Sequence, residues 1–141
     1  QQQVTRRNGD VNRGLSVFAN VTVQDRETSQ VGHFIQLGFT YKGVFDARPQ
    51  DDLGFGVARI STNSRFRNNQ KAINQANNLS DYNNPAYQPV QGNEYDAELY
   101  YGIHATRWLV IRPNVQYVRD PGGVSEVDDA WVLGVKLQSS F

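Results

Sequence analysis

The sequence feature that most constrains the fold is the strict alternation of apolar and polar residues in residues 128–141, DDAWVLGVKLQSSF. Side chains of a β-strand point alternately to opposite faces, so this pattern predicts a strand with one apolar and one mostly polar face. Its length matches one tilted membrane crossing by a strand, about 9–11 residues. An amphipathic strand of a soluble sandwich alternates in the same way, so the rest of the chain must decide. The apolar positions, interrupted only at residue 139, are Trp131, Leu133, Val135, Leu137 and Phe141.

The same alternation recurs along the chain and predicts an all-β, antiparallel sheet of about six strands. Parity fails at Arg59 and Ile60, which predicts a bulge or a strand end there. Pro113 removes a backbone donor, which favours an edge or bulged position. Residues 1–5 resemble the tail of an earlier strand. The other predicted strands are 14–25, 31–42, 53–61, 93–102 and 108–118.

The predicted connections are sorted by length. Residues 62–92 are rich in Asn and Gln and too long for an ordinary connection, with a short helix favoured within 67–79. The turns at 46–52 and 105–107 are short. Short periplasmic turns and long external loops are typical of transmembrane barrels, so we expect 62–92 to be external. Aromatic residues near the predicted strand ends fit two interfacial girdles: Tyr41, Tyr101, Trp108, Tyr117 and Trp131.

Composition excludes several classes of protein. The 14 basic and 14 acidic residues balance, which gives no basic face for nucleic acid, and the absence of Cys excludes disulfides and thiol chemistry. No run of 18 apolar residues predicts a transmembrane helix. A mean hydropathy of -0.61 suits a barrel, in which only alternate residues meet lipid. The absence of Met predicts a removed leader or a piece of a longer chain.

Four segments resemble one family, the carbohydrate-selective porins of the OprB family, over residues 14–141. They are GLSVFANVTVQD, DDLGFGVARISTNSRF, EYDAELYYGIHATRWLVIRPNVQYVRDPGG and VLGVKLQSSF. The resemblance implies a barrel of about 16 strands in a Gram-negative outer membrane, with residues 1–141 as the C-terminal portion of that single domain. It implies diffusion of glucose and similar sugars. The final strand, ending at Phe141, is similar to the signal read by the barrel-assembly machinery, and the resemblance leaves a homotrimer as one option.

The polar faces predict a substrate path along the lumen. A hairpin about residues 105–107 places one acidic group across from one basic and amide group, and the last strand extends this wall. Carboxylates and amides hydrogen-bond to sugar hydroxyls, and charged ladders set pore selectivity. An ordinary hydrated wall without recognition would carry the same residues. The predicted path residues are Glu94, Asp96, Glu98, Arg112, Asn114, Gln116 and Lys136.

Enzyme chemistry is not supported. Paired carboxylates are the catalytic groups of glycoside hydrolases. Asp96 and Glu98, however, lack the apolar surroundings that raise the pKa of a catalytic acid. His33 and His104 lie on different predicted strands, and no G-x-S-x-G turn occurs. We therefore expect no enzyme, metal or cofactor. Three alternatives stay open: a general or anion-passing porin, a soluble β-sandwich that binds carbohydrate, and a truncated product without its own function.

Overall fold

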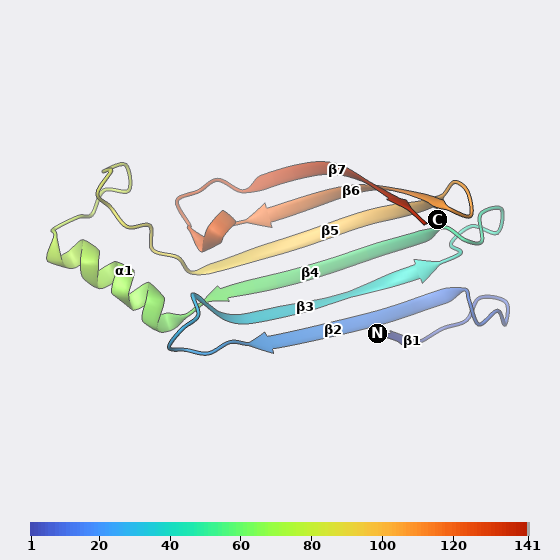
Figure 1. Ribbon diagram of the computed structural model, residues 1–141, viewed down its shortest axis with the longest axis horizontal. Coiled ribbons are helices and arrows are strands. Elements are labelled where there is room, and N and C mark those ends of the chain that lie inside the picture. The colour runs from blue at the N-terminus through green and yellow to red at the C-terminus, as the bar shows by residue number, and fades with distance from the viewer. Residues whose placement is uncertain (141) are drawn as a thin grey trace.

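The computed structural model describes residues 1–140 and contains one antiparallel sheet of seven strands, ordered β1 to β7 as in the sequence (Figure 1). The predicted all-β antiparallel architecture is therefore confirmed, and the additional strand is β1, in the segment that resembled a strand tail. The strands are β1 Gln2–Gln3, β2 Gly14–Val23, β3 Val31–Lys42, β4 Asp52–Thr62, β5 Asn93–His104, β6 Leu109–Arg119 and β7 Ala130–Ser139. A helix, α1 Ser64–Ala76, and a short 3-10 turn, η1 Pro121–Gly123, complete the described elements. No helix within residues 1–140 is long and apolar enough to cross a membrane.

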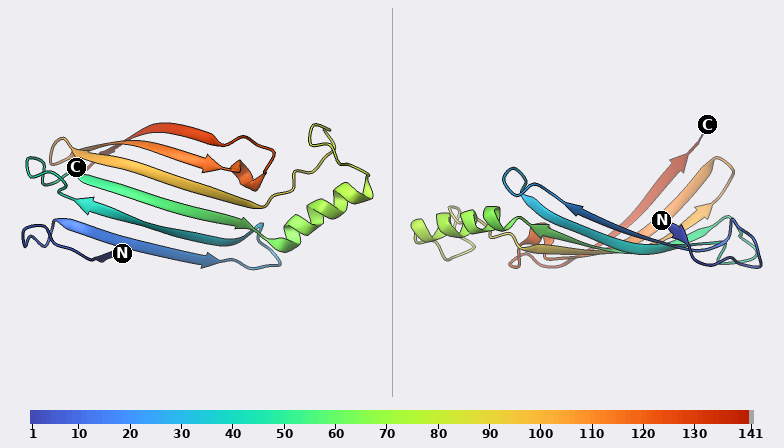
Figure 2. Two further views of the ribbon diagram at one scale, coloured as in Figure 1. Left: turned by 180° about the vertical axis from the view of Figure 1, so that it is seen from behind. Right: turned by 90° about the horizontal axis from the view of Figure 1, so that it is seen from below.

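The sheet is a single curved layer (Figure 2). Among residues 1–140 the one buried apolar side chain is Val124, whereas Leu133 is 83% exposed and Trp131 is 71% exposed. The side chains that are buried are polar, with Asp51 only 2% exposed. A water-soluble domain buries its apolar residues, so this distribution is inverted.

The strand register aligns apolar residues with apolar residues, and polar residues with polar residues, across the whole sheet. One row of paired residues is apolar and another is mostly small or polar, because neighbouring strands keep the same parity. Side chains converge on the concave side of a curved sheet and spread apart on the convex side. The polar row is the more buried, which makes the polar face concave and the apolar face convex. The apolar row is Val17, Phe39, Phe55, Leu99, Val115 and Leu133, and the other row is Phe18, Gly38, Gly56, Glu98, Gln116 and Val132.

Two local expectations about strand irregularity were wrong. β4 continues to Thr62, and its pairing with β5 is unbroken from Asp52 to Ser61, so Arg59 keeps its place on the apolar, convex face. Pro113 lies in β6, which is an interior strand. The missing amide is accommodated by a gap in the β5–β6 ladder between the pairs Tyr100–Asn114 and Ile103–Ile111.

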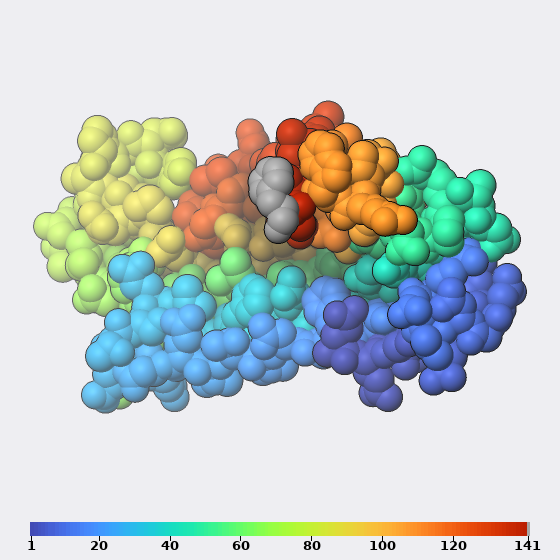
Figure 3. Space-filling view, turned by 45° about the vertical axis from the view of Figure 1, so that its right-hand side comes forward, coloured from blue at the N-terminus to red at the C-terminus, as the bar shows by residue number. Residues whose placement is uncertain are grey.

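The connections are sorted between the two ends of the sheet. Residues 43–51 and 105–108 connect strands at one end, and residues 63–92 connect β4 to β5 at the other. Helix α1 extends beyond the strand ends instead of crossing the concave face (Figures 1 and 2). In the space-filling view the green middle strands lie recessed between the blue and the orange-red edges, so the concave face is a trough (Figure 3).

Phe141, the basis of the expected assembly signal, lies outside the described residues.

The segment between β4 and β5 is ordered by amide side chains. Asn74 donates to the carbonyl of Gln88 at 2.8 Å and accepts from its amide at 2.8 Å. Gln70 accepts from the amide of Gln91 at 3.0 Å. These contacts bind α1 to the returning chain without an apolar core, which explains the Asn and Gln content. The helix starts three residues before the predicted 67–79 because Asn63 caps it at Ser64.

Candidate functional site

Glycines on the concave face make room for aromatic rings. A Cβ atom at Gly54 would lie 2.2 Å from Cε1 of Tyr100, its cross-strand partner. A Cβ atom at Gly38 would lie 2.4 Å from the carbonyl oxygen of Phe55 and 2.7 Å from Cζ of Phe18, its cross-strand partner. The rings therefore occupy space that side chains would otherwise fill. Both rings lie close against the wall of the trough for that reason.

These two rings border a recess of about 250 Å³ in the trough. Gly56 contributes to its floor. A Cβ atom at Gly56 would lie 3.6 Å from Phe18 Cζ. Two carboxylates that alternate along β5, Asp96 and Glu98, enter the same recess. Aromatic faces next to hydrogen-bonding carboxylates and amides suit a polyhydroxylated ring. The concave-face side chains that line the recess are Phe18, Gln36, Thr40, Ala58, Asp96, Glu98 and Tyr100.

Beside the recess, Asn114 connects β5 to β7. Its Nδ2 donates to Oε1 of Glu98 at 2.7 Å. Its side chain lies over Gly134, where a Cβ atom would be 2.4 Å from Asn114 Oδ1. The glycine thus lets an amide, like the two rings, lie close against the wall.

A second polar cluster lies at the end of the trough that carries the short turns. Asp52, 5% exposed, faces His104 Nε2 at 3.2 Å and an Arg112 amino group at 3.5 Å. The Arg112 guanidinium also lies 5.1 Å from the centroid of the Tyr100 ring. Asp52 Oδ2 and Arg112 Nε are buried without a hydrogen-bond partner among the described residues. Buried polar atoms are normally satisfied, so this cluster has unused hydrogen-bonding capacity.

The turn beside this cluster is held by Asp51. Its carboxylate accepts from Arg48, from the Tyr101 hydroxyl at 2.9 Å and from the His104 amide at 2.9 Å. Burial alone would raise the pKa of Asp51, but the three donors outweigh it and hold the pKa below the ordinary value of 3.8. The carboxylate is therefore charged at neutral pH and fixes the start of β4 against the end of β5.

All seven predicted path residues lie on the concave face, but not as one opposed pair of groups. Glu98 pairs with Gln116 and contacts Asn114, whereas Asp96 pairs with Val118. Glu94 accepts a hydrogen bond from the Gly122 amide. The expected opposition of the acids to Arg112, Asn114 and Gln116 holds for Glu98, which faces Gln116 and contacts Asn114. It does not hold for Asp96, which pairs with Val118, and the register places Arg112 nearer the other end of the hairpin.

The register instead arranges the charges in series along the trough. The three acids of β5 occupy the half near α1. Arg112 pairs with Lys136 in the other half, where Lys42 pairs with Asp52. A solute that moves along this wall meets an acidic zone and then a mainly basic zone.

Sequence reasoning missed the aromatic and glycine part of the site. The parity of β2 already places Phe18 among polar residues, and that was the available signal. At Gly54 the absence of a side chain allows the close approach of the Tyr100 ring. The cluster at Asp52 was not predictable from the sequence, because contacts between residues of β4, β5 and β6 depend on the strand register. Within residues 1–140, no group of His, Asp or Glu could hold a metal ion.

The fold and the trough define a class: a membrane β-barrel wall with its apolar face toward lipid and its polar face toward a lumen. Residues 1–141 match the family model described as carbohydrate-selective porin, OprB family. The chain is 57% identical over 141 residues to Porin B of Pseudomonas aeruginosa, and it spans 31% of that relative's length. It belongs to the OprB family of carbohydrate-selective porins.

Solved structures agree with this assignment. The high pH structure of Pseudomonas putida OprB matches with a TM-score of 0.96 and 56% identity, over 99% of this chain and 33% of that one. The low pH structure of the same protein matches with a TM-score of 0.67 and 46% identity, over the same shares. The chain thus spans about a third of the length of the proteins it matches. It is a chain of an outer-membrane β-barrel protein.

Proposed function

We propose that the trough is part of the wall of a water-filled barrel through which glucose and similar sugars diffuse. The observation that carries this proposal is the recess between Phe18 and Tyr100. It combines aromatic rings held against glycines with the carboxylates of Asp96 and Glu98. A sugar ring presents C–H groups to an aromatic face and hydroxyls to carboxylates, so the recess offers both contacts. The seven predicted path residues would line the same route.

The serial arrangement of charge supports sugars over ions. A cation is attracted by the acidic half of the wall and repelled by the half with Arg112 and Lys136, and an anion meets the opposite sequence. A neutral solute crosses both zones and gains hydrogen bonds in each. A general or anion-passing porin remains the second candidate, because the same charged side chains hold water in any pore.

The remaining assignments belong to this proposal. Residues 1–141 would form the C-terminal portion of a single barrel domain, with 62–92 external and the turns at 43–51 and 105–108 periplasmic. The final strand would present the assembly signal, and three copies would associate as a homotrimer. Transport by diffusion requires no catalytic group, so we propose no enzymatic activity. The exposed apolar convex face counts against a soluble sandwich.

The proposal is tested by flux and by current block with protein purified from outer membranes. In liposome swelling, glucose should enter faster than a zwitterion of equal size. In planar bilayers, glucose should block ion current, and Tyr100→Ala should raise the half-blocking concentration about fivefold, a loss of about 1 kcal/mol of stacking.

Tyr95→Ala is the matched control, since Tyr95 lies on the same strand with its ring on the convex face. It should leave the block unchanged. Equal swelling rates for glucose and the zwitterion would favour a general porin. A block that survives Tyr100→Ala unchanged would remove the recess from the sugar path.

A further inference from the structure

Two adjoining cavities lie on the convex face near the start of α1. The first, about 530 Å³, has a mixed lining that includes three arginines, Arg26, Arg59 and Arg67. The second, about 350 Å³, is apolar and continues along the strands between Leu37 and Tyr117. Ile35 and Arg59 border both cavities. A cationic pocket that opens onto an apolar groove has the layout of a lipid site, with a head group in one part and an acyl chain in the other.

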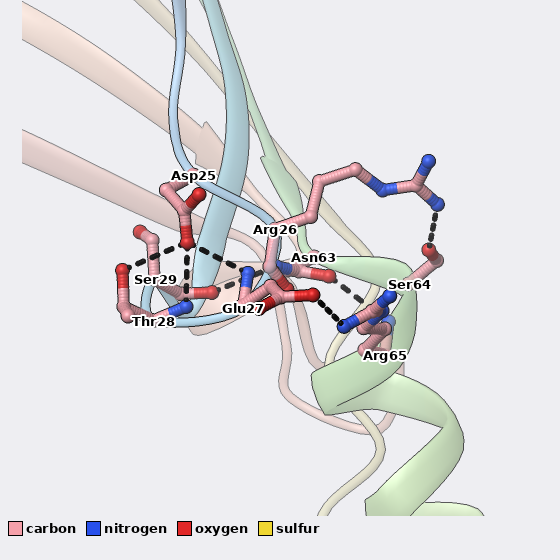
Figure 4. Close-up of polar contacts among 8 residues, drawn as sticks. All are labelled: Asp25, Arg26, Glu27, Thr28, Ser29, Asn63, Ser64 and Arg65. Carbon is pink, nitrogen blue, oxygen red and sulfur yellow. Dashed lines mark hydrogen bonds and ion pairs between the residues drawn. The ribbon is translucent and has the colours of Figure 1, made fainter.

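No carboxylate forms an ion pair with these arginines among residues 1–140. Arg26 donates to the Ser64 hydroxyl at 3.3 Å, and Arg59 donates to Asn93 Oδ1 at 3.2 Å. Asp96 borders the adjoining groove and forms no ion pair with these arginines, and the two acids of the β2–β3 connection are engaged elsewhere. Glu27 pairs with Arg65 at 2.9 Å (Figure 4). The pocket therefore concentrates positive charge that the protein itself does not neutralise.

Asp25, the other acid of the β2–β3 connection, is also engaged. It accepts from the Glu27 and Thr28 amides at 2.8 and 2.9 Å and from the Thr28 hydroxyl at 3.0 Å (Figure 4). These bonds hold the pKa of Asp25 below its ordinary value, so the group stays charged within its own turn. Its carboxylate is directed to that turn, which leaves the pocket basic.

The framework of the pocket is held together by Asn63. Asn63 is 3% exposed, and its Nδ2 donates to the carbonyls of Arg26 and Ser29, both at 2.8 Å (Figure 4). Its Oδ1 accepts from the Arg65 amide at 2.9 Å. One side chain thus joins the β2–β3 connection to the first turn of α1. The arginines of both segments are consequently held around the same cavity.

The level of the pocket on the barrel surface fits a membrane interface. Arg59 and Arg119 both lie over the Tyr95 ring, at 5.8 and 5.9 Å from its centroid. Tyr117 and Trp131 belong to the aromatic girdle at the same end, with ring centroids 4.9 Å apart and ring planes tilted by 43°. An arginine on a lipid-facing wall is costly at the midplane of the bilayer and costs little near the interface. Arg59 is therefore placed where phosphate groups of lipids lie.

We propose that this pocket binds the phosphate of a phosphorylated glycolipid of the outer leaflet, with an acyl chain of the same lipid in the apolar groove. Arginine recognises phosphate through paired hydrogen bonds, and basic pockets at membrane interfaces bind lipid head groups. The outer leaflet of a Gram-negative outer membrane is built from such glycolipids. This inference rests on the proposed orientation, which places α1 outside, and it is independent of which solute the pore passes.

The test uses protein purified from outer membranes and titrated, in mild detergent, with lipid A carrying two phosphates. Native mass spectrometry gives the bound fraction. The double variant Arg59→Gln, Arg67→Gln should raise the dissociation constant at least about tenfold, as expected for lost charge-assisted hydrogen bonds. Lipid A without phosphates should bind the unchanged protein more weakly by a similar factor.

Arg107→Gln is the control, because Arg107 is an exposed arginine in the turn at the opposite end. It should bind like the unchanged protein. Full affinity in the double variant, or equal affinity for dephosphorylated lipid A, would overturn the proposal. Displacement of the lipid by millimolar inorganic phosphate alone would also overturn it, because the groove would then contribute nothing.

The orientation is tested separately. Ser80→Cys, in the segment after α1, should react with a membrane-impermeant maleimide on intact cells. Absence of labelling would contradict the orientation and an outer-leaflet source for the lipid. Sugar flux would be unaffected by that result, so the two proposals fail by different measurements.

Discussion

At the scale of single residues, glycine decides the shape of the concave face. Gly54 has no side chain, and the Tyr100 ring fills the space beside it. The ring in turn lies under the Arg112 guanidinium, which reaches Asp52. The position of one aromatic ring thus connects a glycine in β4 with an ion pair between β4 and β6. Glycines inside strands usually mark such close approaches.

Gly54→Ala tests this arrangement. The new Cβ would lie 2.2 Å from Tyr100 Cε1, so the ring must move. We expect a loss of about 1–3 kcal/mol in the free energy of unfolding, as for overpacking in a filled site. Urea unfolding of the protein reconstituted in lipid measures this loss.

Gly56→Ala is the matched control, two residues along the same face. Its nearest atom, Phe18 Cζ, would be at an ordinary contact distance of 3.6 Å. We expect a change of less than about 0.5 kcal/mol, since ordinary surface contacts tolerate a methyl group. Equal losses for the two variants would show that the Tyr100 contact has no special weight.

At the scale of elements, the long strands and the lengths of their connections were predictable, and the exact start of the helix was not. Alternation identified the six long strands because burial on one side of a sheet imposes period two. It failed to place Arg59, because a charged residue on the convex face is tolerated near an interface, and the pattern treats it as an irregularity. The predicted start of helix α1 was three residues too far along the chain, because the true start depends on the Asn63 cap. The stability of the helix depends on contacts with Gln88 and Gln91, which are distant in sequence.

The amide contacts of α1 lead to a prediction about local stability. Asn74→Ala removes both hydrogen bonds to the Gln88 backbone. The loss of these bonds should lower the free energy of local opening by about 1–3 kcal/mol. Amide hydrogen exchange in residues 64–91 should then become about 5–150 times faster, with β4 and β5 unchanged. Gln75→Ala, at an exposed neighbouring position, should have no such effect. Exchange that accelerates equally in the strands would mean that α1 and the sheet open as one unit.

At the scale of the whole molecule, the sheet is open at both edges. β7 has β6 as its sole strand neighbour among the described residues, and β1 has two residues. Unpaired backbone groups in hydrocarbon cost several kcal/mol each, and barrels of this class begin at about eight strands. The concave site is correspondingly one part of a lumen wall. Sequence periodicity could predict that this wall has two faces, but the position of each charge along it followed only from the register.

We therefore predict that the 141-residue chain, expressed and refolded alone, forms no stable monomeric channel. Its open edges favour association or aggregation over insertion as a closed pore. Single-channel recording in planar bilayers is the measurement, with an eight-stranded barrel refolded in the same way as the control. Uniform, long-lived current steps from the chain alone would contradict the prediction.

The burial of apolar side chains in this protein depends on the surrounding membrane. Within residues 1–140 just one apolar side chain is buried, so the hydrophobic core of this fold is supplied by other molecules, the acyl chains around it. A mismatch between the apolar band and the bilayer costs fractions of a kcal/mol per ångström. A cell that lengthens or shortens its acyl chains therefore repacks the core of this protein without changing one residue. The thermodynamic stability of the fold is in part a property of membrane composition, and it can be regulated by lipid metabolism.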